Sequence, residues 1–327
     1  MKSILTVGNA LTDILAVLPD DSLLKEFNLP IGSMQWVEKA EGEQILERLQ
    51  KFDLQYVPGG SAANTISGTA ILGMPSGFIG KVGDDSIGKL YKEGMEKMGV
   101  KPHLLLGKAP SGRAMVLITP PNSERTFAEY MGATLELCAE DLDEEIFKEY
   151  DIVHIEGYLV QNQDLVRRIA ELAHYFGKEV SIDMASYNVV ESNREFLKEI
   201  VEKYVDVLFA NESEAQAFTG KTEYAAAEEI AKMCKVAVVK LGGKGSIVRS
   251  GDKVYTVEPM KANKVDTTGA GDIYASGFLY GYSLGLPLDV CGKIGTVLSS
   301  KVIEVVGPKL DDERWAEAKR EIARLIG

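Results

Sequence analysis

The sequence predicts a three-layer α/β/α protein with a mostly parallel central sheet and a small second sheet beside it. Apolar runs rich in β-branched residues alternate with stretches of helical spacing along most of the 327 residues. The runs are apolar nearly throughout, which is typical of parallel strands covered on both faces. Two segments, 13–38 and 103–132, are broken by proline and glycine and lack a helical period. We therefore expect one domain over residues 1–327, in which these two segments form a small β-sheet lid.

The first third of the chain opens the alternation. Residues 3–10, SILTVGNA, form an apolar β-branched run that stops at a glycine and predict a buried first strand. Glycine after the last apolar position predicts the end of a helix at Gly99. The remaining elements expected here are helices at 40–52 and 59–73, a strand at 76–83 and a helix at 85–99.

From residue 151 onward the alternation is regular, which indicates repeated βαβ units. Strands are expected at 151–159, 178–185, 205–211, 236–243, 246–250 and 253–257. Helices are expected at 163–177, 193–204, 212–220, 225–234, 270–285, 288–303 and 312–326.

Charge and motif content exclude several classes of function. Lys and Arg number 36 and Asp and Glu 49, a net charge of −13, so we expect no nucleic-acid partner, because phosphate backbones require clustered cations. No window is apolar enough to cross a membrane and the first residues carry no signal peptide, so a cytoplasmic protein is expected. The chain has neither a GxxxxGK[ST] phosphate loop nor a GxGxxG after its first strand, which disfavours P-loop enzymes and dinucleotide oxidoreductases.

Polar residues and glycines recur where the expected strands end. In open α/β sheets, ligands bind beyond the carboxyl ends of the strands. The side chains and glycines expected at that edge are Asn9, Asp13, Gly59, Gly60, Asn64, Asp183, Asn211, Glu212, Glu214, Lys240, Gly242 and Gly245.

The segment TTGAGD, residues 267–272, places a glycine-rich turn just before an expected helix. The first amides of a helix lack internal partners and carry the positive end of its dipole, so Gly269, Ala270 and Gly271 suit an anion such as phosphate. Asp272 would stand beside that anion and accept a proton from an attacking hydroxyl. The helix dipole is expected to lower the pKa of Asp272. The structural alternative is an acid that merely stabilises the first turn, by about 0.3–1 kcal/mol.

Four motifs, in this order, resemble the PfkB (ribokinase-like) family of carbohydrate and nucleoside kinases over essentially the whole chain. They are GGSAANTISGTAILG from residue 59, GFIGKVGDDSIG from residue 77, NESE from residue 211 and DTTGAGD from residue 266. GNALTDILA, ERTFAEYMGA and IEGYL are similar to the adenosine-kinase-like branch. The resemblance implies a ribokinase-like fold and an ATP- and Mg²⁺-dependent kinase that phosphorylates a primary hydroxyl of a furanose-type sugar or nucleoside.

The resemblance also implies roles for individual residues. Asp272 would be the catalytic base, and Gly269, Ala270 and Gly271 the anion hole. The substrate would be held by Asn9, Asp13, Gly59, Gly60 and Asn64. ATP would lie along Asn211, Glu214, Lys240, Gly242, Gly245 and Thr267, with Glu214 acting on Mg²⁺ through water. Asp266 and Thr268 would belong to a monovalent-cation site for K⁺, which many members of the family have, and the lid would form a homodimer, as in some members.

Several alternatives remain open at this stage. Asp13 could cap a turn, Asn64 could lie on a helix surface, and Glu214 could be one more exposed acid. SIDMASYN, from residue 181, lacks the DPN often found at this place in sugar kinases, which weakens the case for Asp183. The lid aromatics Trp36, Phe127 and Tyr130 could contact a nucleobase or pack within the lid.

The function also has rivals. A non-catalytic sugar or nucleotide sensor on the same fold would need no base, and an NAD-linked oxidoreductase is suggested only by the α/β pattern. Within the kinase interpretation, the acceptor stays open among adenosine, other nucleosides, ribose and fructose-type sugars.

Overall fold

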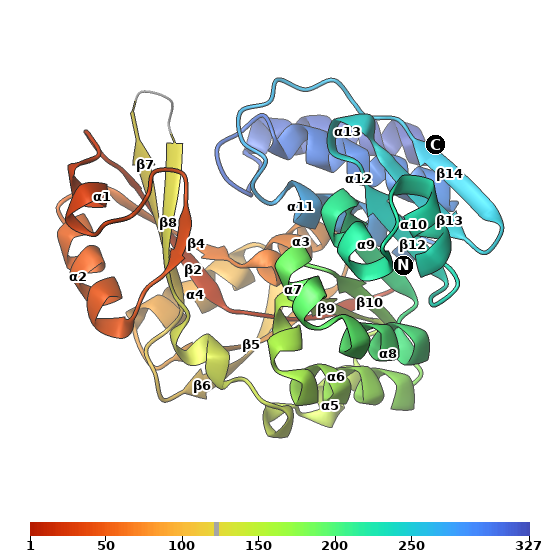
Figure 1. The fold of residues 1–327 in the computed structure, drawn as a ribbon, viewed down its shortest axis with the longest axis horizontal. Coiled ribbons are helices and arrows are strands. Elements are labelled where there is room, and N and C mark those ends of the chain that lie inside the picture. The colour runs from red at the N-terminus through yellow and green to blue at the C-terminus, as the bar shows by residue number, and fades with distance from the viewer. Residues whose placement is uncertain (121–123) are drawn as a thin grey trace.

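The computed structural model describes residues 1–120 and 124–327, and these form a large three-layer unit with a smaller sheet standing beside it (Figure 1). Residues 121–123, inside the expected lid segment 103–132, lie outside the described part. The mixed α/β architecture, with a large mostly parallel sheet and a second smaller sheet, confirms the fold class. No described helix is long and apolar enough to cross a membrane.

The large sheet has nine strands, and all neighbouring pairs are parallel except the two at the β14 edge. In spatial order the strands are β14 (Lys253–Val257), β13 (Ser246–Ser250), β12 (Val236–Lys240), β11 (Val207–Asn211), β10 (Glu179–Asp183), β9 (Ile152–Glu156), β1 (Ile4–Val7), β5 (Ser76–Gly83) and β6 (Val100–Gly107). Successive residues of β1 point to opposite faces, so Ile4 packs in one core layer and Leu5 in the other.

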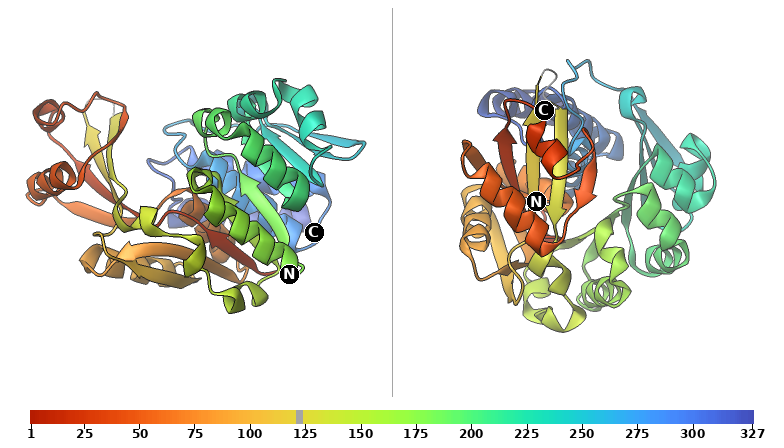
Figure 2. Two further views of the ribbon diagram at one scale, coloured as in Figure 1. Left: turned by 60° about the horizontal axis from the view of Figure 1, so that its bottom comes forward. Right: turned by 60° about the vertical axis from the view of Figure 1, so that its left-hand side comes forward.

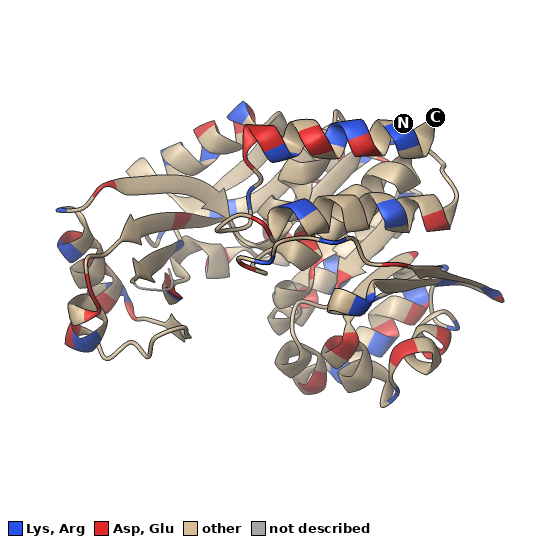
Figure 3. Cartoon of the chain, turned by 90° about the horizontal axis from the view of Figure 1, so that it is seen from above, with Lys and Arg blue, Asp and Glu red and all other residues tan. Residues whose placement is uncertain are grey.

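Helices cover both faces of this sheet, and each face has its own apolar core. One face is covered by α3 (Ser61–Ile71), α4 (Ser86–Lys97), α11 (Ala270–Ser283) and α12 (Leu288–Val302). The other is covered by α5 (Glu144–Lys148), α6 (Gln163–Tyr175), α7 (Tyr187–Ser192), α8 (Arg194–Tyr204), α9 (Glu212–Thr219) and α10 (Glu223–Ile230). The last helix, α13 (Asp312–Ile326), packs against α12. Figure 3 shows Lys and Arg interspersed with Asp and Glu along the outer helices, as expected for solvated faces.

Side-chain caps begin several of these helices where the sequence suggests a start. Asp85 accepts a hydrogen bond from the amide of Gly88, and Asn211 forms a capping box with Glu214 at the start of α9. Gly220, in the left-handed region at φ 73°, ends α9.

The smaller sheet has five strands and projects from one side of the large unit (Figure 2). Their spatial order is β3 (Met34–Trp36), β8 (Glu124–Tyr130), β7 (Arg113–Thr119), β2 (Leu11–Val17) and β4 (Leu54–Gly59). The helices α1 (Ser22–Glu26) and α2 (Lys39–Leu49) cover one face, where an apolar cluster includes Ala16, Met115 and Ile45. The opposite face is turned toward the carboxyl ends of the large sheet's strands.

The strands of the smaller sheet differ from the expected lid segments in two places. Residues 103–107, expected in the lid, belong to β6 and pair with β5 in the large sheet. The strand β4, outside both expected segments, pairs with β2 and closes one edge of the smaller sheet. Strand pairing depends on partners far away in the chain, so the local pattern at these residues does not decide which sheet they join.

Candidate active site

The glycine-rich turn leads directly into α11, which begins at Ala270. Gly269 occupies the N-cap position with φ 71°, in the left-handed region that favours glycine. A Cβ at this position would also lie 2.4 Å from Cβ of Pro308, so the close approach of these two segments requires glycine. α11 begins at this turn, where the amide of Ala270 donates to the carbonyl of Thr267, while those of Gly271 and Asp272 have no backbone acceptor among the described residues.

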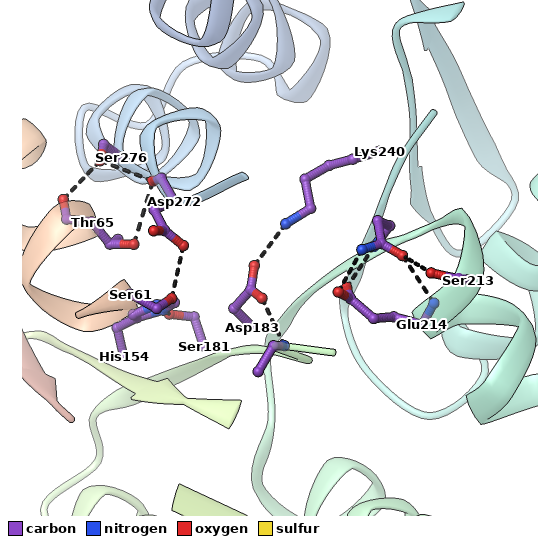
Figure 4. Close-up of polar contacts among 12 residues, drawn as sticks. Ser61, Thr65, His154, Ser181, Asp183, Ser213, Glu214, Lys240, Asp272 and Ser276 are labelled. Carbon is purple, nitrogen blue, oxygen red and sulfur yellow. Dashed lines mark hydrogen bonds and ion pairs between the residues drawn. The ribbon is translucent and has the colours of Figure 1, made fainter. Parts of the chain in front are cut away.

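Asp272, in the first turn of α11, is held by two side chains of α3, of which Figure 4 shows Ser61. Ser61 Oγ donates to Asp272 Oδ1 at 2.7 Å, and Asn64 Nδ2 donates to Oδ2 at 3.0 Å. The two helices are tied together further along, because Ser276 Oγ donates to the carbonyl of Thr65 at 2.7 Å. These contacts fix both the position and the orientation of the carboxylate. Asn64 is buried, which excludes the alternative of an exposed polar residue on a helix surface.

The pKa of Asp272 is raised, whereas the helix dipole was expected to lower it. Burial raises this pKa to about 6, and the negative charge of Asp183 adds to the rise. The hydrogen bonds from Asn64 and Ser61, and the charge of Lys240, offset it in part. Desolvation therefore outweighs the dipole, and Asp272 is a stronger base than the sequence suggested.

A cavity of about 220 Å³ opens beside this carboxylate, between the two sheets. From the large unit its lining includes Asn9, Gly60, Ser61, Asn64, Thr134, Glu156, Tyr158, Gln161, Asn162, Thr268 and Pro308. From the smaller sheet it includes Leu11, Asp13, Met34, Trp36, Phe127, Glu129 and Met131. Of the three lid aromatics named from the sequence, Tyr130 is not in the lining, and its ring contacts the guanidinium of Arg113.

Asp13 reaches this cavity from β2, where it pairs with Val57 of β4 and lies diagonally across from Gly59. Leu11 pairs directly with Gly59, and a Cβ on Gly59 would lie 2.3 Å from Asp13 Oδ1, so any larger residue would displace the carboxylate. Gly60 has φ 89°, and a Cβ at this position would lie 2.5 Å from the carbonyl oxygen of Asn9. Burial raises the pKa of Asp13 to about 6, against the lowering effect of Lys309 and Arg125. Asp13 lies within a strand, which excludes the turn-capping alternative.

The sequence analysis missed Glu156, which lines the cavity at the end of β9. Its Oε1 accepts from Asn9 Nδ2 at 2.5 Å, and its Oε2 accepts from the amide of Ala62 at 2.9 Å. Burial raises the pKa of Glu156 to about 7. Its position as the last residue of an apolar strand was a usable signal, because carboxyl ends of parallel strands carry ligand-binding groups.

On the other side of Asp272, Lys240 and Asp183 form a buried ion pair (Figure 4). Lys240 Nζ lies 2.7 Å from Asp183 Oδ2, while Asp183 Oδ1 accepts from the amide of Ala185 at 2.9 Å. A Cβ on Gly271 would lie 3.0 Å from Lys240 Nζ, which places this ammonium beside the anion-hole turn. Asp183, kept as a weak candidate from sequence, is the residue that positions the lysine.

Asn211 and Glu214 form a reciprocal pair at the start of α9 (Figure 4 shows Glu214). Glu214 accepts from the backbone amide of Asn211 at 2.7 Å and from its side chain at 2.5 Å. Only 2% of Glu214 is exposed, so it is not a surface acid. Burial raises its pKa to about 7, and Asp183 adds to the rise. No group of three or more potential ligands is placed to hold a metal among the described residues, so Mg²⁺ would need water and phosphate oxygens as further ligands.

The carboxylate of Asp266 is bound on both oxygens. Its Oδ1 accepts from the amide and the hydroxyl of Thr268, at 2.9 and 2.7 Å, and its Oδ2 accepts from the amide of Gly307 at 2.9 Å. Arg125 Nη1, from β8 of the smaller sheet, lies 3.1 Å from the same Oδ2. Burial alone would raise the pKa of Asp266, but these hydrogen bonds and the Arg125 charge lower it overall.

Lys309 was also missed, and nothing in its local sequence marks it. Burial lowers the pKa of Lys309 to about 8, against the raising effect of the carboxylates of Asp13 and Asp272. Its ammonium therefore offsets part of the negative charge around the cavity.

The remaining candidates lie at the edge of the site. Gly242 and Gly245 bound the 3-10 turn after β12, with φ 54° and 91°, and neither lines the cavity. Thr267 precedes the anion-hole turn, and its carbonyl accepts from the amide of Ala270 at 3.2 Å.

Comparison with known families and proteins supports a common architecture and chemistry. The model of the pfkB family of carbohydrate kinases matches residues 25–314. Adenosine kinase of Saccharomyces cerevisiae is 28% identical over 344 residues, covering 97% of this chain and 99% of that protein. A nucleoside kinase of Methanocaldococcus jannaschii is 29% identical over 260 residues, with 79% and 82% covered.

Two solved structures match nearly the whole chain at higher identity. Adenosine kinase from Sinorhizobium meliloti is 34% identical with a TM-score of 0.84, covering 98% of this chain and 99% of that chain. A probable sugar kinase from Rhizobium etli is 31% identical with a TM-score of 0.86, covering 99% of both chains.

Proposed function

Because this chain belongs to the pfkB family of carbohydrate kinases, which makes it an ATP-dependent sugar or nucleoside kinase, we propose that it phosphorylates the primary hydroxyl of a nucleoside. The observation that carries the proposal is the placement of Asp272. Its carboxylate stands at the start of α11, bonded to Ser61 and Asn64, which line a cavity that also contains Asp13. A non-catalytic sensor would not require a base at this point.

The acceptor is proposed to bind with its ring hydroxyls at the Asp13 end of the cavity. Carboxylate and amide groups from Asp13 and Asn64 can accept and donate hydrogen bonds to vicinal hydroxyls. Gly59 and Gly60 have no side chains that would fill this end, and Asn9 completes the polar wall. The primary hydroxyl then lies near Asp272, which accepts its proton as the oxygen attacks phosphorus.

Charge on the transferring phosphoryl group is proposed to be balanced by α11 and by Lys240. The amides of Gly269, Ala270 and Gly271 begin the helix, where the dipole favours an anion. Lys240, beside Gly271 and held by Asp183, adds a full positive charge next to that turn. A preorganised arrangement of this kind stabilises developing charge with little movement of the protein.

The residues present fit ATP and Mg²⁺. Asp183, Glu214 and Asp272 bring three carboxylates into electrostatic contact with the ammonium of Lys240, and Lys309 offsets part of the charge of Asp272. Three carboxylates near two ammonium groups leave a region suited to a further cation. When bound, Mg²⁺ would neutralise phosphate charge. We propose that Glu214 and Asn211 hold it through water, and that Thr267, Gly242 and Gly245 line the ATP path.

Three further expectations stay predictions. The first is the K⁺ site at Asp266 and Thr268 implied by the resemblance, which the Arg125–Asp266 ion pair argues against. A homodimer through the lid would have to use the edge strand β3, because α1 and α2 cover the outer face of the smaller sheet. Sedimentation velocity would detect such a dimer. The third expectation is that the protein is cytoplasmic.

The proposed function is tested by ADP release from ATP and Mg²⁺ with a panel of nucleosides and free sugars. We expect nucleosides to be phosphorylated on the primary hydroxyl, which phosphorus NMR of the product would identify. The matched control is the 5′-deoxy form of each accepted nucleoside, which lacks that hydroxyl and should release no ADP. Turnover with free sugars alone, or with the 5′-deoxy compounds, would contradict the proposal.

A further inference from the structure

A second carboxylate, Glu129, lines the cavity from the smaller sheet. Strand register places it in a single cross-strand row with the substrate residue Asp13. Asp13 pairs with Ala114 on β7, Ala114 pairs with Glu129 on β8, and Glu129 pairs with Trp36 on β3. Paired residues point to the same face of a sheet. The row therefore places two acids and an indole on the cavity side.

The spacing along this row matches a ligand longer than one sugar ring. Two strand separations of about 4.8 Å put the backbones of Asp13 and Glu129 about 10 Å apart. The residue between them is Ala114, which is small and buried beneath its neighbours. A nucleoside extends from its ribose hydroxyls to the far edge of its base, which is long enough to contact both Asp13 and Glu129.

The surroundings of Glu129 are those of a base-binding pocket. Phe127 and Met34, paired with each other on β8 and β3, line the same face one row further along. Tyr158 lines the opposite wall, and the charges of both Glu129 and Asp272 contribute to raising its pKa, so this ring lies within electrostatic range of both ends of the cavity. Aromatic rings in such positions offer stacking surfaces to a planar base.

Glu129 lacks a charged partner within the described part of the chain. Burial raises its pKa to about 7, Asp13 raises it further, and only the side chain of Trp36 opposes the rise. A largely buried carboxylate without a cation is costly, and hydrogen bonds from N–H groups reduce that cost. The side chain of Trp36 supplies one such hydrogen bond, and the N–H groups of a base bound in this pocket would supply others.

We propose that Glu129 is a specificity-determining residue that accepts a hydrogen bond from the amino group of a purine base, while Asp13 holds the ribose. This inference rests on the proposed function, because it assumes that the acceptor occupies the cavity beside Asp272. It narrows the acceptor to an amino-bearing purine nucleoside, in preference to free ribose or fructose.

The test measures binding without turnover, so it does not depend on phosphoryl transfer. Calorimetry would compare adenosine with purine riboside and guanosine with inosine, each pair differing by one amino group, with ribose as a further ligand. In the unaltered protein the amino-bearing member of at least one pair should bind about 10- to 100-fold more tightly, the range for a hydrogen bond to a charged group. Glu129→Leu should remove that difference by weakening only the amino-bearing ligand.

Glu124→Gln is the matched control, since Glu124 lies on the same strand β8 but is exposed and does not line the cavity. Glu124→Gln should preserve the tighter binding of the amino-bearing nucleoside. Glu129→Gln, which keeps a carbonyl acceptor, should retain part of that preference. Equal binding within both pairs by the unaltered protein, or equal weakening of both members by Glu129→Leu, would overturn the inference. Binding preference with no ADP release would instead contradict the proposed function and leave the role of Glu129 supported.

Discussion

At the scale of single residues, the site depends on carboxylates whose ionisation is set by burial. Asp13, Asp272 and Glu156 all have pKa values raised above the usual range, because desolvation disfavours their charged forms. Such groups titrate near neutral pH, where a general base is effective. The effect arises only when α3, α11 and the smaller sheet enclose them.

Replacing the proposed base tests the mechanism directly. We expect Asp272→Asn to lower kcat by about 10²-fold or more, the usual scale for loss of a general base. The asparagine keeps the shape and can still contact Ser61 and Asn64, so the fold and acceptor binding should be preserved. Steady-state kinetics and a thermal melt would check both points, and a variant that turns over near the unaltered rate would exclude Asp272 as the base.

The dependence on pH follows from the same carboxylate. Asp272 must be ionised to accept a proton, so kcat/KM, which reports the free enzyme, should fall as pH decreases through about 6, the raised pKa of this group. Ser61 donates to Asp272 and stabilises its ionised form, so Ser61→Ala should move the acidic limb of the profile to higher pH.

The control for this shift is Ser33→Ala, a serine-to-alanine change in the smaller sheet outside the cavity lining. The pH profiles of the unaltered protein, Ser61→Ala and Ser33→Ala would show whether the acidic limb moves in Ser61→Ala alone. An acidic limb that stays in place in Ser61→Ala would assign the titration to another group, such as Asp13 or Glu156.

At the scale of elements, the position of α11 depends on small residues where it crosses α12. A Cβ on Gly277 would lie 2.7 Å from the carbonyl of Ile294 and 2.9 Å from Cα of Gly295. The two helices therefore approach closely enough that their backbones nearly touch. This contact fixes the N-terminus of α11, and with it the anion-hole turn, against the rest of the large unit.

A larger side chain at that crossing should push the helices apart. We expect Gly277→Val to lower the free energy of unfolding by about 1–3 kcal/mol, as overpacking of a core does. Gly243→Ala is the control, because no atom lies within 4 Å of a Cβ there and its φ is not positive. Urea unfolding midpoints would measure both, and an unchanged midpoint for Gly277→Val would contradict the close packing.

Some elements and site residues were predicted correctly from the sequence, and others were not. Local patterns predicted β5, β13, β14 and α13 at the bounds that the structure has, and β5 and β13 bury continuous apolar runs whereas β14 is a mostly exposed edge strand. The prediction that residues 103–107 belong to the lid was wrong, because strand pairing is decided by distant segments. In the site, the anion-hole turn and Asp13 were recognisable from the chain, whereas Lys309 follows a Gly-Pro pair with no local signal of its role.

At the scale of the whole molecule, Arg125 connects the smaller sheet to the loop before α11. Its guanidinium pairs with Asp266, and both side chains are largely buried, at 8% and 17% exposed. The pair ties β8 of the smaller sheet to the large unit. It also occupies the carboxylate that would otherwise bind a monovalent cation.

The requirement for a monovalent cation should therefore depend on Arg125. We expect ADP release by the unaltered protein to be similar in potassium and tetramethylammonium chloride, because Arg125 already neutralises Asp266. Arg125→Met should make the rate depend on K⁺, while Arg249→Met, at a cation paired with Glu228 elsewhere, should not. Strong K⁺ activation of the unaltered protein would instead favour the cation site expected from the resemblance.

Most of the alternation of strands and helices, the parallel layer and the glycine-rich turn ending in Asp272 could be predicted from the chain, because they depend on periodicity and residue type within short windows. The folded structure was needed to show that Asp13 and Glu129 share one face of a sheet, that Lys240 is held by Asp183, and that burial raises the pKa of Asp272. These features depend on strand register and on desolvation, which arise when segments distant in the chain pack together.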